Sequence, residues 1–417
     1  MKHLLYYNLN SQFVTAQVNA GGDGTNVVSV VDGVAWCKDS ENTYYRYAKP
    51  ESENLTSYTI TLHYVDSEGH TLAPDSTVTT IAYKNKGTEQ LLTPKEISGV
   101  SANEGAVSLL ITGNTEYTFS YPLTLYELCP LTFKIISGGT IQWKFRGTNQ
   151  EAYSGAKTIQ YRINKGSWIT ITSDTGTSAS LINVESGDTV EFIGNNSSYG
   201  VTSSSYNSFS SSTTTLRYEA YGNIMSLIDS TGFTNLNTIQ AEYVFLGLFS
   251  DNSLIVSCEN LILPATTLTQ HCYTWMFSNC VNITTAPELP ATTLAGSCYA
   301  NMFMGCTSLT GAPVLPATTL AQSCYAAMFA GCTGLTSAPE LPATTLAMYC
   351  YMNMFSNCEK LNYVKCLATD ISAAYCTYRW MNGVQTNSGT FVKDQSMTSW
   401  TTGNNGVPNN WAVQDAS

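Results

Sequence analysis

The chain has 417 residues, only 12% of them charged, and its net charge of −12 with an isoelectric point near 4.7 excludes the basic footprint that nucleic-acid binding requires. Ser, Thr, Asn, Gly and Tyr supply much of the polar surface, a composition typical of β-rich extracellular or virion proteins, and the length predicts two to four domains. Because no run of 18 apolar residues occurs, we expect no membrane span.

The first predicted segment, residues 1–54, opens with an apolar stretch too short for a signal peptide, since Asn8 and Asn10 interrupt it. Residues 27–37, together with Tyr44 and Tyr45, resemble the amino-terminal segment of virion proteins of Bacteroides phages, including crAss-like phages. The resemblance implies that residues 1–54 anchor the chain to other virion proteins. The alternative is an edge strand of an ordinary β domain.

The second predicted segment, residues 55–128, alternates apolar and polar residues. Residues 58–65 predict a half-buried strand and residues 66–69 a turn, and further strands are expected at 78–83, 91–97 and 117–121. The motif Tyr64-Val65-Asp66, Gly69 and Leu72-Ala73-Pro74 resembles the MucBP-like domain. That resemblance implies a small, β-grasp-like domain that either binds mucin or serves as a spacer.

The third predicted segment, residues 129–221, has strand-like runs separated by Gly- and Asn-containing turns. Six or more short strands at a spacing of about 8–12 residues indicate a β-sandwich. The Ser/Thr/Asn-rich stretch 195–215 is expected to be either a long loop or an exposed edge, and its composition suits a binding surface as well as a plain solvated loop. The predicted strands are 131–136, 140–145, 158–163, 168–172, 180–184 and 189–193.

The phrase Leu-Pro-Ala-Thr-Thr-Leu begins at Leu263, Leu289, Leu315 and Leu341, each 26 residues after the last. A strict period of this length predicts stacked repeats with atypical end units. In one unit, Pro313 and Pro316 keep the leading segment extended. The apolar residues that follow have the spacing of one face of a short helix, which Gly331 would end: Leu320, Cys324, Tyr325, Met328 and Phe329.

Within one unit, Cys306, Leu309, Leu315-Pro316, Phe329 and Cys332 resemble the BspA-type leucine-rich repeat. The resemblance covers residues 222–384, leaves 385–417 as a carboxy-terminal cap, and implies adhesion or surface display without catalysis. The expected fold class is therefore multidomain. Small β domains, β-grasp-like and β-sandwich, precede a short α/β leucine-rich-repeat solenoid.

Nine of the thirteen cysteines fall into two repeat columns. Within a unit they are spaced Cys-x7-Cys, unlike the Cys-x2–4-Cys of zinc sites. We expect them to be small buried hydrophobes; disulfides between the columns and metal binding are the alternatives. The two columns are Cys272, Cys298, Cys324, Cys350 and Cys376, then Cys280, Cys306, Cys332 and Cys358.

No catalytic motif is recognisable in the chain. A nucleophile elbow, a phosphate loop and a His-Glu-x-x-His helix are all missing from the sequence. His271 directly precedes Cys272, but adjacent residues of a helix diverge and do not form a catalytic pair. We therefore expect no enzymatic activity, no cofactor and no metal site.

If the repeats bind a ligand, the positions at which the copies disagree are the place to look. Trp275 and Tyr349 are suited to stack on sugar rings; the alternative is that they are ordinary exposed helix residues. The candidate binding residues are Gln270, His271, Trp275, Asn301, Gln322, Tyr349 and Asn353.

These features lead to one functional hypothesis and two alternatives. A chain built like an adhesin, but starting without an export signal, is expected to reach the outside on a phage particle released by lysis. The leading hypothesis is a non-enzymatic virion protein, a head or tail fibre or decoration subunit, that displays its repeats to a host-surface or mucin glycan or protein. The alternatives are a bacterial cell-surface BspA-like adhesin and a carbohydrate-active enzyme with accessory domains. Homo-oligomers are typical of fibres, although no coiled-coil heptad is visible.

Overall fold

The structure is a computed structural model. It describes residues 55–416 except 68, 70, 84–86, 96, 98–100, 123, 148–154, 175–180, 212 and 385–387, together with the backbone of five short strands before residue 54. Contacts divide the chain into two compact units, residues 1–63, 75–93 and 106–118, and residues 64–74, 94–105 and 119–417. Strands dominate both, as the composition predicts. None of the helices in the described part of the chain has the length and hydropathy of a membrane-spanning segment.

The amino-terminal strands form two small antiparallel sheets. β1 (Leu5–Tyr7) pairs with β2 (Phe13–Thr15), and β4 (Val34–Lys38) lies between β3 (Val27–Val31) and β5 (Tyr44–Tyr47). The motif 27–37 therefore falls largely on β3 and β4. Apart from these five strands, the predicted anchoring segment 1–54 lies outside the described residues.

The segment that resembles a MucBP-like domain consists of strands. β6 (Leu55–Val65) lies between β10 (Thr115–Ser120) and β7 (Thr71–Tyr83), and β8 (Thr88–Leu92) pairs with β9 (Val107–Ile111). The predicted strand 58–65 is confirmed, because Ile60, Leu62 and Tyr64 are buried at alternate positions. The predicted turn is confirmed too: the Gly69 N–H donates to the Asp66 carbonyl at 3.1 Å, and Gly69 adopts a φ of 89°. The described residues of this stretch end in one short helix, α1 (Leu125–Leu128), and the β-grasp-like resemblance stays a prediction.

Two sheets face each other over residues 131–223. The strand orders are β14-β13-β16-β11-β19 and β15-β12-β18-β17. Phe133 on β11 and Phe192 on β16 contact Phe209 on β18, with ring centroids 5.0 and 4.8 Å apart. All six predicted strands are present. The bounds are β11 (Leu131–Ser137), β12 (Gly139–Arg146), β13 (Thr158–Ile163), β14 (Ile169–Thr172), β15 (Leu181–Val184), β16 (Thr189–Gly194), β17 (Gly200–Thr202), β18 (Ser205–Ser211) and β19 (Arg217–Asn223).

The prediction that residues 195–215 form a loop or an exposed edge holds for the edge strand β17, but it is wrong for residues 205–211. β18 runs between β12 and β17, and its Ser205, Asn207 and Ser208 are buried. Hydrogen bonds make this possible, because the Asn207 side-chain amide donates to the carbonyls of Gly155 at 3.0 Å and Tyr199 at 2.8 Å. A polar strand of this kind has the composition of a loop and the environment of a core.

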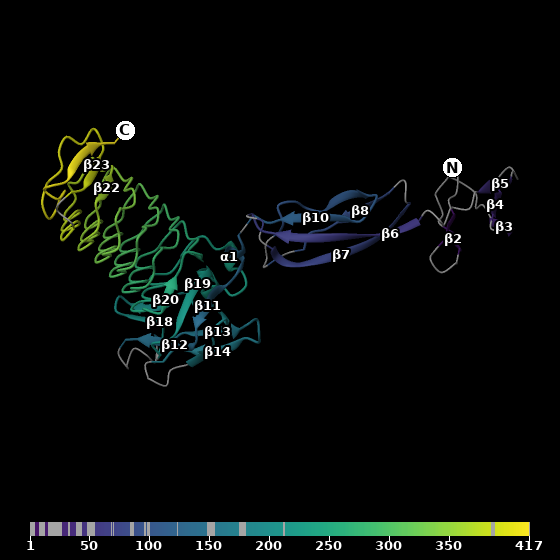
Figure 1. The fold of residues 1–417 in the computed structure, drawn as a ribbon, viewed down its shortest axis with the longest axis horizontal. Coiled ribbons are helices and arrows are strands. Elements are labelled where there is room, and N and C mark those ends of the chain that lie inside the picture. Colours follow the sequence, from purple (N-terminus) through teal and green to yellow (C-terminus); the bar gives the residue numbers. More distant parts are fainter. Residues whose placement is uncertain are drawn as a thin grey trace. The chain divides into compact units, whose positions relative to one another are not determined.

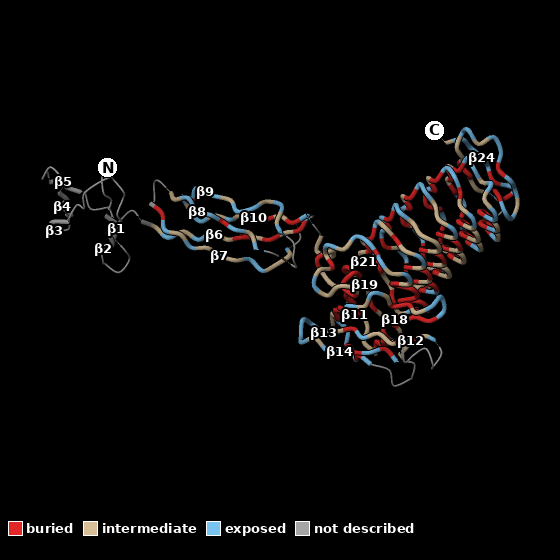
Figure 2. The backbone as a smooth tube through the Cα atoms, turned by 180° about the vertical axis from the view of Figure 1, so that it is seen from behind, coloured by how far each residue is buried: buried red, intermediate tan, exposed pale blue. Residues whose placement is uncertain are grey.

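The repeats continue directly from the sandwich as a stack of coils, the repeat array (Figures 1 and 2). β19 pairs in parallel with β20 (Ile255–Ser257) and β21 (Leu261–Ile262), and parallel bridges then link successive coils, as between Thr267 and Thr293. At the far end, β22 (Tyr363–Cys366), β23 (Thr390–Lys393) and β24 (Ala412–Asp415) form a parallel sheet. One apolar core extends from Leu131 to Trp411.

The predicted helix in each unit is wrong, and so is the α/β description of the array. In residues 323–331, every second N–H donates to the next coil, as from Tyr325 to the Cys350 carbonyl at 3.1 Å. The intervening N–H groups close turns on the residue three positions earlier, as from Met328 to Tyr325. Ser323 and Ala327 have φ values of 55° and 51°, which a right-handed helix does not contain. The described helices are α1 (Leu125–Leu128), η2 (Ile224–Leu227) and η3 (Phe233–Asn235), all outside the regular repeats.

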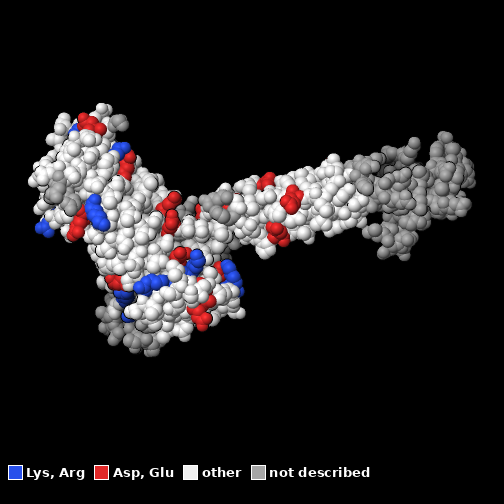
Figure 3. Space-filling view, viewed as in Figure 1, with Lys and Arg blue, Asp and Glu red and all other residues white. Residues whose placement is uncertain are grey.

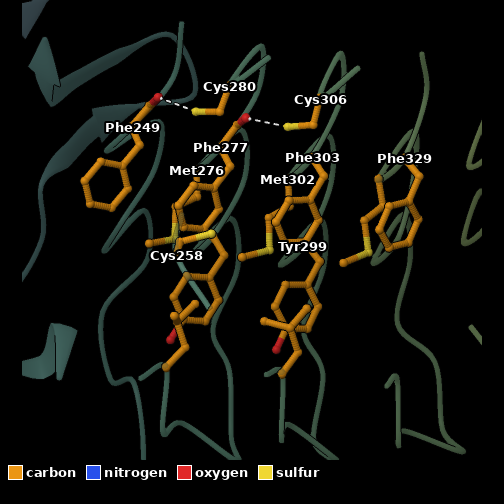
Figure 4. Close-up of a cluster of buried hydrophobic side chains, with 14 of the residues drawn as sticks. Phe249, Cys258, Met276, Phe277, Cys280, Tyr299, Met302, Phe303, Cys306 and Phe329 are labelled. Atoms are coloured by element: carbon orange, nitrogen blue, oxygen red, sulfur yellow. Dashed lines mark hydrogen bonds between the residues drawn. The ribbon is translucent and has the colours of Figure 1, made fainter. Parts of the chain in front are cut away.

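The interior of the array contains two aromatic ladders (Figure 4). In the phenylalanine ladder (Phe249, Phe277, Phe303, Phe329 and Phe355), successive ring centroids lie 5.3–5.8 Å apart. In the tyrosine ladder (Tyr273, Tyr299, Tyr325 and Tyr351), the spacing is 5.6–6.2 Å. The ladders bury large apolar surfaces, the main favourable term in stacking the coils.

The repeat cysteines are buried, as predicted. All cysteines of both columns are at most 3% exposed, and every described cysteine is a free thiol. The second column also ties coils together, because each Sγ donates to a phenylalanine carbonyl of the preceding coil. Cys280 reaches the Phe249 carbonyl at 3.0 Å, and Cys306 reaches the Phe277 carbonyl at 3.1 Å.

Candidate functional site

The turn segments of the array carry three columns of residues with positive φ, the outer columns. Each coil contributes one residue to each column. Within a coil, the residues of adjacent columns are four positions apart along the chain. The first outer column is Tyr243, His271, Ser297, Ser323, Tyr349 and Tyr375; the second is Gly247, Trp275, Asn301, Ala327, Asn353 and Arg379; the third is Asp251, Asn279, Gly305, Gly331, Asn357 and Gly383.

The structure places the seven predicted binding residues on or next to these columns. His271 and Tyr349 belong to the first outer column, whereas Trp275, Asn301 and Asn353 belong to the second. A further pair precedes the first column by one residue, and both of its members are exposed: Gln270 and Gln322. Backbone hydrogen bonds fix the order of the columns. The Asn301 N–H, for example, donates to the Ala326 carbonyl of the next coil at 2.8 Å.

Two stacked aromatic pairs lie in the first outer column. The rings of Tyr243 and His271 are 5.1 Å apart with an angle of 5° between their planes, and those of Tyr349 and Tyr375 are 5.2 Å apart at 1°. Tyr375 is 58% exposed, so this surface is accessible. Between the pairs, the same column holds Ser297 and Ser323.

Sequence reasoning missed half of each pair. Tyr375 follows Tyr349 by the repeat period of 26 and was detectable, but it lies in the degenerate last unit. Tyr243 precedes His271 by 28 residues, so a strict period does not find it. Tyr378 contacts Tyr375 edge to face at 5.8 Å, and the Arg379 guanidinium lies 5.3 Å from the Tyr378 ring.

The candidate surface has almost no charge. Between Leu261 and Cys358 the acidic and basic residues are Glu288 and Glu340, and both precede a repeat leucine in the extended segment. Partial burial lowers the pKa of His271, against the opposing effect of Glu242, so the imidazole is neutral near pH 7. In Figure 3 the array carries few coloured charges over its visible face.

The described residues do not assemble the parts of a cysteine or metal site. The Cys272 side chain is fully buried, whereas the His271 ring is partly exposed and lies 3.3 Å from the Thr274 hydroxyl through its Nδ1. Burial raises the pKa of Cys298 to about 12, which keeps that thiol protonated. Across the described part of the chain, no three His, Cys, Asp or Glu side chains are grouped to hold a metal.

Comparisons with protein-family models, with curated proteins and with solved structures found no match to this chain. The resemblances to virion proteins, to MucBP-like domains and to BspA-type repeats rest on their short motifs.

Proposed function

We propose that the chain is a non-enzymatic surface protein of a phage particle, a fibre or decoration subunit of the head or tail. Its repeat array is proposed to be a leucine-rich-repeat solenoid of the BspA type that binds a host-surface or mucin glycan. Residues 1–54 would attach the chain to other virion proteins, and the MucBP-like strands would act as a spacer or a second mucin contact.

One observation carries the proposal. The interior positions of the four copies are the same aromatic, sulfur and leucine residues, while the outer columns differ from copy to copy. Packing explains the constancy of the interior. The outer side chains contribute little to that packing, so they are free to serve recognition, and aromatic and amide groups at such positions are typical of binding surfaces.

Localisation and adhesion test the proposal separately. Mass spectrometry of purified particles should detect the chain in the virion; its absence there, with its presence in a cell envelope, would replace the proposal with the bacterial adhesin. The purified full chain should also bind immobilised mucin or host cells. Failure to bind either surface would remove the adhesive part of the proposal.

A further inference from the structure

We infer that the first outer column binds a neutral linear glycan laid along the stacking axis, with the aromatic pairs Tyr243–His271 and Tyr349–Tyr375 as its two contact points. This inference rests on the proposed adhesive function and assigns it a ligand class, an orientation and residues.

The residue types in the column are the first argument. All three outer columns have the same left-handed backbone, which costs a side chain with a Cβ about 1–2 kcal/mol and suits Gly, Asn and Asp. The third column contains those three residue types alone. The first column accepts the strain at every coil, with tyrosine, histidine and serine at φ values of 55–58°. Relief of strain therefore does not explain the side chains of the first column, and a surface role does.

The geometry of the pairs is the second argument. Both pairs stack along the direction in which the coils stack, with planes within 5° of parallel. His271 and Tyr349 are three coils apart, which corresponds to about 15 Å at the usual spacing of hydrogen-bonded backbones. The two pairs thus form two aromatic contacts on one line, separated by the short side chains of Ser297 and Ser323.

The chemistry of the surface selects the ligand. Aromatic rings offer apolar faces on which the C–H faces of sugars pack, and their rigid side chains lose little entropy on binding. Side-chain amides in the neighbouring positions, including Gln322 and Asn353, can donate to and accept from sugar hydroxyls. Between Leu261 and Cys358 an acidic glycan would find no lysine or arginine, and Arg379, whose guanidinium lies 5.3 Å from the Tyr378 ring, is a cation at one end of the column. The uncharged surface therefore favours a neutral glycan.

The two contact points predict a dependence on ligand length. A monosaccharide reaches a single pair, whereas an oligosaccharide that spans three coils contacts both pairs in one binding event. Affinity should rise steeply at the length that first bridges the pairs, because the second contact becomes intramolecular. A single compact site would show no such step.

The test measures binding of the full chain to neutral linear oligosaccharides, from glucose to cellohexaose and in the matching xylo- and manno- series, by calorimetry. Oligogalacturonides serve as acidic probes. We expect binding that strengthens with length among the neutral probes. Tyr349→Ala and Tyr375→Ala should each weaken it about tenfold, the equivalent of 1.4 kcal/mol, while Tyr349→Phe should retain it.

Tyr363→Ala is the matched control, since Tyr363 is also an exposed tyrosine, 37% exposed, but lies on β22 outside the outer columns. It should bind as the unmodified chain does, and thermal unfolding of each variant will confirm that the array is folded. Equal binding by the Tyr349, Tyr375 and Tyr363 variants, absence of binding to every neutral probe, or preference for the acidic probes would overturn the inference. If mucin or cells still bind in those cases, the proposed adhesive function survives without it.

Discussion

The phenylalanine ladder and the first outer column place rings at nearly the same spacing, yet they differ in how their residues are chosen. Phe277, Phe303 and Phe329 recur unchanged and are fully buried. At the outer column the corresponding coils carry His271, Ser297 and Ser323. Inside, each ring is held by rings above and below, so any change leaves a cavity. In the outer column, the backbone alone sets the spacing of the residues, and packing does not restrict which side chain each position carries.

The largest expected difference between the two regions is their response to alkaline pH. Burial raises the pKa of Cys298, Cys350, Cys358 and Cys366 to about 12, from an ordinary value of 9.0. Below pH 9 these thiols are protonated in both the folded and the unfolded chain, so their full contribution to stability is present. As the pH rises from 9 to 12, these thiols lose their protons in the unfolded chain but keep them in the folded chain. Each thiol therefore lowers the free energy of unfolding by about 1.4 kcal/mol per pH unit.

We therefore expect the free energy of unfolding of the array to fall steeply between pH 9 and 12, as measured by denaturant titration at several pH values. Cys298→Ala should reduce the pH dependence of the free energy of unfolding by the contribution of one proton, about 1.4 kcal/mol per pH unit. A substitution of His271 in the outer column should leave this pH dependence unchanged. A flat profile between pH 9 and 11 would show that the interior tolerates thiolates.

The second prediction removes one step of the phenylalanine ladder. Phe303 has no exposed surface and stacks on Phe277 at 5.6 Å and on Phe329 at 5.7 Å. Phe303→Ala should lower the free energy of unfolding by about 3–5 kcal/mol, the usual cost of such a cavity. Denaturant midpoints measure it, with Tyr349→Ala as the outer-column control, for which we expect a loss below about 1 kcal/mol. Similar losses at both positions would contradict the distinction between inside and outside.

The third prediction concerns buried hydroxyls. The Tyr325 hydroxyl is buried and has no hydrogen-bond partner among the described residues, whereas the Tyr199 hydroxyl donates to the Leu227 carbonyl at 2.6 Å. Because a buried polar group without a partner costs about 1–3 kcal/mol, Tyr325→Phe should raise the free energy of unfolding by about 1–2 kcal/mol. Tyr199→Phe should lower it. The same sign in both variants, measured by thermal unfolding, would refute the assignment.

Much of this organisation could be predicted from the sequence. The predictions that failed have a common physical cause. The period of 26 predicts the stack, and the disagreement between copies points to the outer columns. The apolar pattern Cys324, Tyr325, Met328 and Phe329 suits both a helix and a four-residue turn repeat, because over ten residues the periods 3.6 and 4 bury nearly the same positions. Only the dihedral angles separate them, and Ala327 gives no sign of a positive φ.

The buried strand β18 was missed for a related reason. Serine and asparagine indicate loops when their hydrogen bonds are unknown, and the partners of Asn207 lie eight and 52 residues away. Likewise, the pairing of Tyr243 with His271 depends on a coil of irregular length. Long-range partners and irregular spacings are the information that residue patterns do not contain.

The last prediction tests the backbone that the outer columns share. Ala327 has a φ of 51°, so its Cβ strains the left-handed turn, while its neighbour Ala326 is buried and absent from the positive-φ positions. Ala327→Gly should raise the free energy of unfolding by about 1 kcal/mol, because glycine adopts this conformation without steric cost. Ala326→Gly should lower it by about 0.5–1 kcal/mol, the ordinary effect of added chain entropy. Opposite signs at adjacent alanines in the same turn would establish that the outer columns hold strained side chains. Equal signs would mean that the left-handed turn costs Ala327 nothing, and backbone strain would then no longer support a surface role for the side chains of the first column, which has the same backbone conformation.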